Sequence, residues 1–151
     1  MIEVESESWK EFSGTSITHP DEQEKFYRIF AKYAIANGWL CGHFLEVKGE
    51  PIAYIYGVNF NGIFSSLKVS YKVRFKAYGP ENLIRMYTLQ ELYKQRVRIH
   101  DFTGVCEEHK MRWANKTYGR TTYRLFNRTL KGVSLQAISK IRQWESSLSQ
   151  K

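Results

Sequence analysis

Residues 39–71 read WLCGHFLEV-KGE-PIAYIYGVNF-NG-IFSSLKVSY, and their pattern predicts the central sheet of the fold. Two short turn signals divide it into three runs rich in β-branched and aromatic residues: 39–47, 51–60 and 63–71. Asn61-Gly62 is a strong hairpin signal because both residues tolerate positive φ, and Lys48-Gly49-Glu50 predicts a tight turn. Three strands joined by such short connections predict an antiparallel meander.

Apolar residues at helical spacing flank the meander on both sides. Before it, Asp21 is expected to cap a helix that ends at Asn37-Gly38, with Glu24 completing a capping box. After Gly79-Pro80, the pattern predicts these further elements: a helix over 81–96, a short strand over 98–102, a short helix over 107–116, a strand over 119–127 and an amphipathic C-terminal helix over 130–148. This order predicts one mixed α+β domain over residues 1–151, with a mostly antiparallel sheet flanked by helices. Residues 1–20 are expected to be weakly structured or to add a first strand.

The composition of the 151 residues is that of a globular chain, with 42% hydrophobic and 25% charged residues. Its net charge of +8 favours anionic partners such as phosphates, nucleic acid or an acidic membrane surface. Two cysteines and four scattered histidines form no spaced ligand set, so no metal site is expected. The acidic first residues do not resemble a signal peptide, and no apolar run is long enough for a membrane span. A cytoplasmic location is therefore expected.

The segment before the second main predicted helix holds the residues best suited to bind a charged ligand. Lys72, Arg74 and Lys76 precede Gly79-Pro80, so a basic loop leads into a helix N-terminus. Free N–H groups and the positive end of the helix dipole favour an anion there, most often a phosphate. A simple solvated loop remains the alternative. Neither a Walker-type motif nor a G-x-G-x-x-G motif is present, which argues against P-loop and Rossmann nucleotide sites.

Three segments together resemble a known family: His43–Ala53 in the meander, Ser70–Pro80 before the second main helix, and Asp101-Phe102-Thr103-Gly104 followed by His109–Trp113. They are similar, in the same order, to the GNAT superfamily of N-acetyltransferases, in the branch of the CelD-like and FemAB-like acyltransferases. The likeness covers residues 22–127. The chain departs from the family pattern at Pro80-Glu81, where a second glycine is usual, and at His109, where the branch has tyrosine.

The resemblance implies acetyl-CoA or another acyl-CoA as co-substrate, bound where the third meander strand splays from its neighbour. Carried over position by position, it implies the following cofactor contacts: Val69, Lys76, Ala77, Tyr78, Gly79, Asn82 and Leu83. It also implies transfer of an acyl group to a small-molecule or peptide amine by direct attack.

Such a transfer needs a base for the amine and a proton for the leaving thiolate. The candidate bases are Glu46, Asp101, His100 and His43, with Glu46 and Asp101 preferred. His109 and Tyr118 are the candidate acids. For each of these side chains, a purely structural or solvated role is the competing interpretation.

Two other functions remain open. The first is an aminoacyl-tRNA-dependent lobe of the FemAB type. The second is a non-catalytic domain that binds RNA or assembles, for example as a homodimer through the C-terminal helix. The basic and aromatic residues that would serve RNA binding are Arg112, Trp113, Lys116, Tyr118, Arg120, Tyr123, Arg124, Arg128 and Lys131. A solvated basic face is the preferred interpretation of this run.

Overall fold

The computed structural model describes residues 1–12, 14, 16, 21–121, 123 and 125–148. The chain forms two compact units, Met1–Arg112 and Trp113–Lys151. Each unit is described by itself below.

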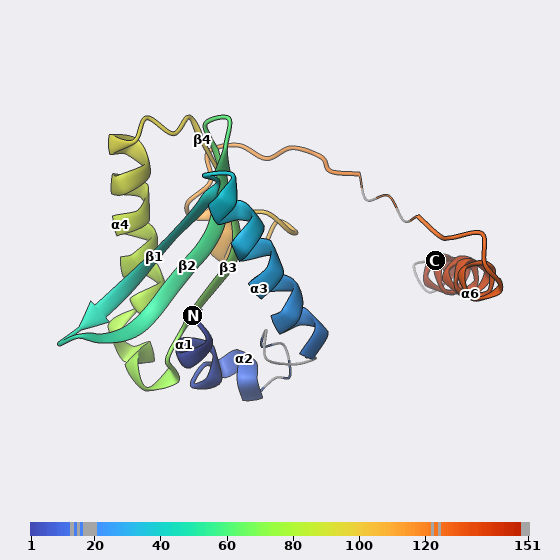
Figure 1. Cartoon of the computed structure of the whole chain (residues 1–151), viewed down its shortest axis with the longest axis horizontal. Helices are drawn as coiled ribbons and strands as arrows, with labels where there is room; N and C mark the ends of the chain where they lie inside the picture. Colours follow the sequence, from blue (N-terminus) through green and yellow to red (C-terminus); the bar gives the residue numbers. More distant parts are fainter. Residues whose placement is uncertain (13, 15, 17–20, 122, 124, 149–151) are drawn as a thin grey trace. The chain divides into compact units, whose positions relative to one another are not determined.

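The described residues of the first unit form ten elements (Figure 1). In chain order they are α1 (Ile2–Ser6), α2 (Trp9–Phe12), α3 (Asp21–Ala36), β1 (Leu40–Val47), β2 (Glu50–Phe60), β3 (Ile63–Tyr71), the 3₁₀ helix η1 (Val73–Tyr78), α4 (Pro80–Lys94), β4 (Ile99–Asp101) and α5 (Glu108–Met111). In the second unit, α6 spans Leu130–Leu148.

The four strands form one sheet in the order β1-β2-β3-β4. The meander β1-β2-β3 is antiparallel, and β4 pairs in parallel with β3. A bulge interrupts the β2–β3 ladder between Tyr56 and Gly57. A Cβ on Gly57 would lie 2.2 Å from the Ser65 carbonyl oxygen, so only glycine fits this close approach of the two strands. The predicted fold class, a mostly antiparallel sheet flanked by helices, is confirmed.

Helices cover both faces of the sheet (Figure 1). On one face, Ile84 and Leu92 of α4 pack against Ala53, Ile55 and Phe64. On the other face, Val4 of α1 packs with Tyr54 and Tyr56, and three side chains of α3 complete the cluster: Tyr27, Phe30 and Ala31. The strict alternation of a strand sends successive side chains to opposite faces, and this alternation separates Tyr54 from Ile55.

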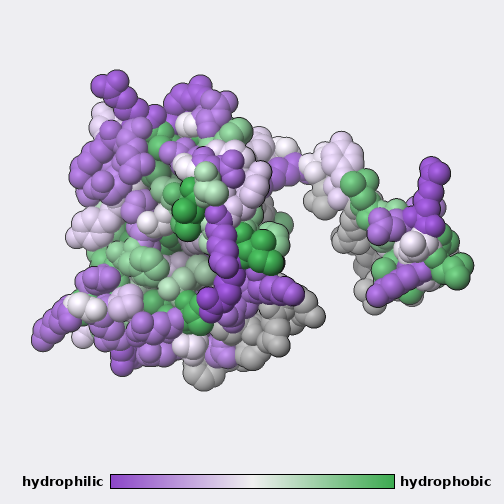
Figure 2. Space-filling view, viewed as in Figure 1, coloured by the Kyte–Doolittle hydropathy of each residue, from purple (hydrophilic) through white to green (hydrophobic). Residues whose placement is uncertain are grey.

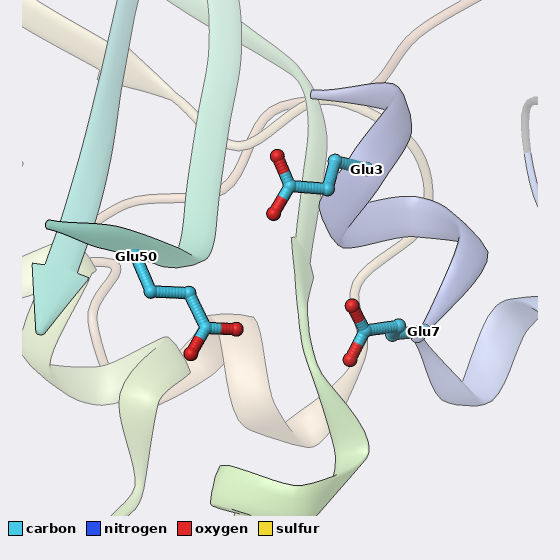
Figure 3. Close-up of side chains that lie close together, drawn as sticks. All are labelled: Glu3, Glu7 and Glu50. Carbon is cyan, nitrogen blue, oxygen red and sulfur yellow. The ribbon is translucent and has the colours of Figure 1, made fainter.

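A buried lysine fixes α1 to the sheet. Lys72 directly follows β3, and its Nζ lies 2.7–2.9 Å from carboxylate oxygens of Glu3, Glu7 and Glu50. Figure 3 shows these three carboxylates around one small space. They lie within 4.8 Å of one another, and Lys72 is the cation that joins them, with Arg74 also paired to Glu50.

The charges of this network act on the pKa values of its members. Desolvation alone would lower the pKa of Lys72, but the hydrogen bonds to Glu3 and Glu7, together with the charges of these two carboxylates, outweigh it and raise the pKa. The hydrogen bond from Lys72 lowers the pKa of Glu7. Both shifts favour the charged forms of Lys72 and Glu7, so this pair is ionised at neutral pH.

The structure differs from the sequence-based prediction in four segments. Residues 2–6 and 9–12 are helical, not a first strand, and residues 73–78 form a 3₁₀ helix in place of a loop. The predicted helix over 107–116 is shortened to α5. Among the described residues of 119–127 there is no strand, because alternation alone does not form one without a neighbouring strand edge. The side chain of Asp21, and with it the predicted capping box, lies outside the described part. In the described residues, no helix has the length and apolar character that crossing a membrane would require.

Candidate active site

A groove opens where β3 and β4 separate. The two strands pair at Ile63–Ile99, Phe64–His100 and Ser65–Asp101, and no further pair follows among the described residues. Beyond that point lies a groove of about 620 Å³. Its lining residues come from β3, α2, α4 and the segment after β4: Trp9, Lys10, Ser66, Leu67, Lys68, Val69, Tyr71, Glu81, Arg85, Phe102, Thr103, Glu107, His109 and Lys110.

The edge of β3 that faces this groove has lost its strand partner, and side chains bind its carbonyl groups. The Thr103 hydroxyl donates to the Ser66 carbonyl at 2.6 Å. The Lys10 ammonium donates to the Val69 carbonyl. Burial lowers the pKa of Lys10. The edge therefore presents backbone acceptors to the groove, which an extended ligand with amide groups would pair with as a strand does.

The joint between η1 and α4 is built around Gly79. Its φ of 61° and ψ of 45° are left-handed, which glycine adopts without strain. The Gly79 N–H donates to Lys76, and the N–H groups of Asn82 and Leu83 both donate to the Gly79 carbonyl. The nearest atom to a Cβ built on Gly79 is Asn82 Nδ2 at 4.0 Å, so the space beside this glycine is open.

An internal ion pair neutralises the acidic residue in the first turn of α4. Arg85 Nη2 lies 2.7 Å from Glu81 Oε1, and the buried guanidinium lies over the Phe102 ring at 5.4 Å. Glu81 and Arg85 are spaced i,i+4, which brings them to the same face of the helix. Glu81 therefore adds no uncompensated negative charge to the groove.

His100, the middle residue of β4, lies near two aromatic rings. Its Nε2 hydrogen-bonds to Ser66 Oγ at 2.7 Å, while its buried Nδ1 has no partner among the described residues. Its ring lies near those of Phe64 and Phe102. Burial, and then the charge of Arg85, lower the pKa of His100 to about 4. The imidazole is therefore neutral at physiological pH.

The segment after β4 supplies a second group of titratable side chains. His109 Nε2 lies 3.8 Å from Glu107 Oε2, and Lys110 Nζ lies 2.7 Å from the same oxygen. Lys110 also donates to the Thr103 and Val105 carbonyls, which fixes the turn. The hydrogen bond from Lys110 lowers the pKa of Glu107, so this carboxylate stays ionised beside His109.

The four residues singled out as catalytic candidates lie in different places. His109 lines the groove and is half exposed. Asp101 is at the end of β4, where its carboxylate accepts the Thr103 N–H at 2.9 Å. Glu46 is exposed on β1, at a bulge. Tyr118 belongs to the second unit, where its hydroxyl accepts from Arg120. Of these four, the described groove lining includes only His109.

Of the seven residues expected to contact the cofactor, one is in the groove lining and six lie at the joint between η1 and α4. Val69 lines the groove on β3. Lys76, Ala77 and Tyr78 are exposed on η1, and Gly79, Asn82 and Leu83 form the start of α4.

Sequence reasoning missed several groove residues, among them Trp9, Lys10, Arg85 and Glu107. Arg85 carried a usable signal, because its i,i+4 spacing from Glu81 predicts their ion pair. No pattern in the sequence points to Lys10, because 59 positions separate it from its partner Val69.

Residues 1–111 match the family model described as an acetyltransferase (GNAT) domain. Searches of curated proteins and of solved structures gave no significant match. The match covers the whole sheet, the groove and the joint at Gly79. The chain belongs to the GNAT acetyltransferase family.

Proposed function

We propose that this chain is an acyl-CoA-dependent N-acyltransferase that transfers an acyl group to an amine by direct attack. Family membership supports acyl transfer in general. The observation that carries the proposal is the groove that opens beyond the last β3–β4 pair, with an edge of β3 that has no strand partner along it. The open space beside Gly79 also supports the proposal. The three sequence motifs favour the CelD-like and FemAB-like branch within the family.

The residues present fit a thioester carried on a long, amide-containing arm. The arm would pair with the β3 edge at Val69, which requires Lys10 to release the Val69 carbonyl. The pyrophosphate would lie along Lys76, Ala77 and Tyr78 and beside Gly79, where a Cβ would meet open space. Asn82 and Leu83 would flank it in the first turn of α4.

An acyl-CoA supplies an activated carbonyl with a thiolate leaving group. In the proposed reaction, His109 takes a proton from the amine as the C–N bond forms, and the same proton then goes to the sulfur as the C–S bond breaks. Glu107, 3.8 Å from His109, stabilises the protonated imidazole between the two transfers. Asp101 and Glu46 remain the competing bases, and Tyr118 the competing acid.

Titration calorimetry with acetyl-CoA tests the proposal. We expect acetyl-CoA to bind at one site. A longer acyl-CoA is titrated separately as a second ligand, and ATP is the anionic control. A folded sample that gives no heat with acyl-CoA at millimolar concentration would contradict the proposal. Equal binding of ATP and acetyl-CoA would indicate a general anion site instead.

A further inference from the structure

Nearly all of the net charge of the chain lies in its second unit. By sequence, Trp113–Lys151 contains a single acidic residue, Glu145, and eight basic ones: Lys116, Arg120, Arg124, Arg128, Lys131, Lys140, Arg142 and Lys151. Eight minus one gives +7, out of +8 for the whole chain. From Arg112 to Arg128 every fourth residue is basic. This concentration of charge lies outside the acetyltransferase match, which ends at residue 111.

The same unit exposes apolar side chains that it does not cover itself. In the part of α6 whose side chains are described, the large apolar residues are all exposed within the structure: Leu130, Val133, Leu135, Ile138 and Ile141. Leu125 before the helix is 95% exposed, and Tyr118 and Tyr123 are exposed too. Figure 2 shows hydrophobic and hydrophilic residues together on the surface of this helix. Most of the stability of a helix in a protein comes from packing its apolar face, so the apolar side chains of α6 need a surface to pack on.

We propose that the second unit binds an anionic lipid surface. Cations such as Lys116, Arg120 and Arg128 would lie at the headgroups, and α6 would lie in the plane of the interface with its apolar side chains among the acyl chains. Each basic residue near an anionic leaflet adds attraction, and apolar area removed from water adds the rest. The proposal does not depend on the chemistry of the groove.

Charge complementarity favours this partner over two others. RNA would account for the cations and tyrosines but would leave Leu130, Val133 and Ile138 in water. A second copy of α6 would cover those side chains but would bring two units of +7 together. An anionic membrane surface satisfies the cations and the aliphatic side chains at once.

Vesicle co-sedimentation of the full chain tests the proposal. We expect binding to phosphatidylcholine vesicles that contain about 30% phosphatidylglycerol, weaker binding to phosphatidylcholine alone, and loss of binding at high salt. The triple substitution Lys116→Gln, Arg120→Gln, Arg128→Gln should weaken binding by roughly 10- to 100-fold. The matched control removes three exposed cations from the first unit: Lys25→Gln, Lys48→Gln and Arg96→Gln. It should leave the binding unchanged.

A second pair of variants tests the apolar contribution. Val133→Glu with Ile138→Glu should abolish vesicle binding, while Ile35→Glu, at an exposed site on α3, should not. Circular dichroism and acyl-CoA binding report whether the first unit is intact in each variant.

Three results would overturn the proposal. The first is tight binding to single-stranded RNA together with none to the vesicles. The second is vesicle binding that the Val133→Glu, Ile138→Glu variant retains in full. The third is a lipid-free dimer, seen by light scattering, that the same variant converts to a monomer.

Discussion

His109 is the catalytic candidate that the groove geometry favours. Replacing it with glutamine keeps a hydrogen-bonding side chain but removes proton transfer at the ring. We expect His109→Gln to lower kcat by about 10²–10⁴-fold and to leave acyl-CoA affinity within a few-fold. Glu46→Gln is the matched comparison, because Glu46 is a competing base that is exposed on β1. Steady-state kinetics of both variants decide between the two residues. A large loss of kcat in Glu46→Gln, together with a normal kcat in His109→Gln, would show that Glu46 on β1 is the base.

His100 gives the fold a dependence on pH. Its pKa is about 4 in the folded chain and near 6.5 when unfolded, so the unfolded chain binds the extra proton first as pH falls. Stability is therefore full above about pH 6.5 and is lost as pH falls toward 4, by up to roughly 3 kcal/mol. His100→Phe, which suits the neighbouring rings of Phe64 and Phe102, should flatten this loss between pH 7 and 5.

Urea unfolding at several pH values measures the effect. The wild-type chain, measured in parallel over the same pH range, is the reference. If His100→Phe loses stability with acid as steeply as the wild type, another group causes the loss.

At the scale of elements, Lys72 joins α1, β2 and the end of β3. Lys72→Met would leave three carboxylates within 4.8 Å of one another with Arg74 as the remaining cation in the network. We expect the free energy of unfolding at pH 7 to fall by about 1–3 kcal/mol, a moderate cost because the carboxylates remain partly in water. Chemical denaturation measures it, with Lys48→Met at an exposed turn as the control.

The same network predicts how the difference in unfolding free energy between wild type and Lys72→Met changes with pH. The pKa of Glu7 is lowered from 4.5, so its contribution is present above that pH and lost as pH falls through the lowered value. The pKa of Lys72 is raised from 10.5, so its contribution lasts until pH rises through that raised value. The gap between wild type and Lys72→Met should therefore narrow in acid; a gap that widens below pH 4 would contradict the network.

Gly79 has two properties at the joint between η1 and α4 that can be tested separately: it adopts a positive φ, and it has no Cβ. Gly79→Val forces a β-branched residue to φ 61° and should cost about 1–2 kcal/mol of stability. Gly79→Asn tolerates that φ but carries the same Cβ into the open corner. We expect both variants to weaken acyl-CoA binding at least 10-fold and only the valine to lower Tm clearly. Normal acyl-CoA binding by both variants would show that the cofactor lies elsewhere.

At the scale of the whole molecule, the first unit contains the complete sheet and both hydrophobic clusters. A chain that ends at Arg112 should lose only the helical signal of α6 from its circular dichroism spectrum, unfold within a few degrees of the full chain and still bind acyl-CoA. The sequence predicts one domain over residues 1–151, and this truncation tests that prediction. A truncated chain that fails to fold would show that the two units form one cooperative domain.

Local signals in the sequence determined most of the elements. The turn at Asn61-Gly62 set the β2–β3 hairpin, because its residues permit positive φ whatever lies elsewhere in the chain. Gly79-Pro80 placed the start of α4, and the apolar spacing of residues 130–148 gave α6 its bounds. The expected strand at 119–127 was wrong because a strand also needs a partner edge, which alternation does not supply.

The contacts at the groove and around the buried Lys72 come from the folding of distant segments onto one another. The parallel pairing of residues 63–65 with 99–101, the contact of Lys10 with Val69 and the ion pairs of Lys72 with Glu3 and Glu7 join residues far apart in the chain. No local pattern encodes such contacts, because they form only when the sheet and both helix layers assemble together. For the same reason, the residue types at Ser66, Arg85 and Glu107 do not reveal that they line one cavity.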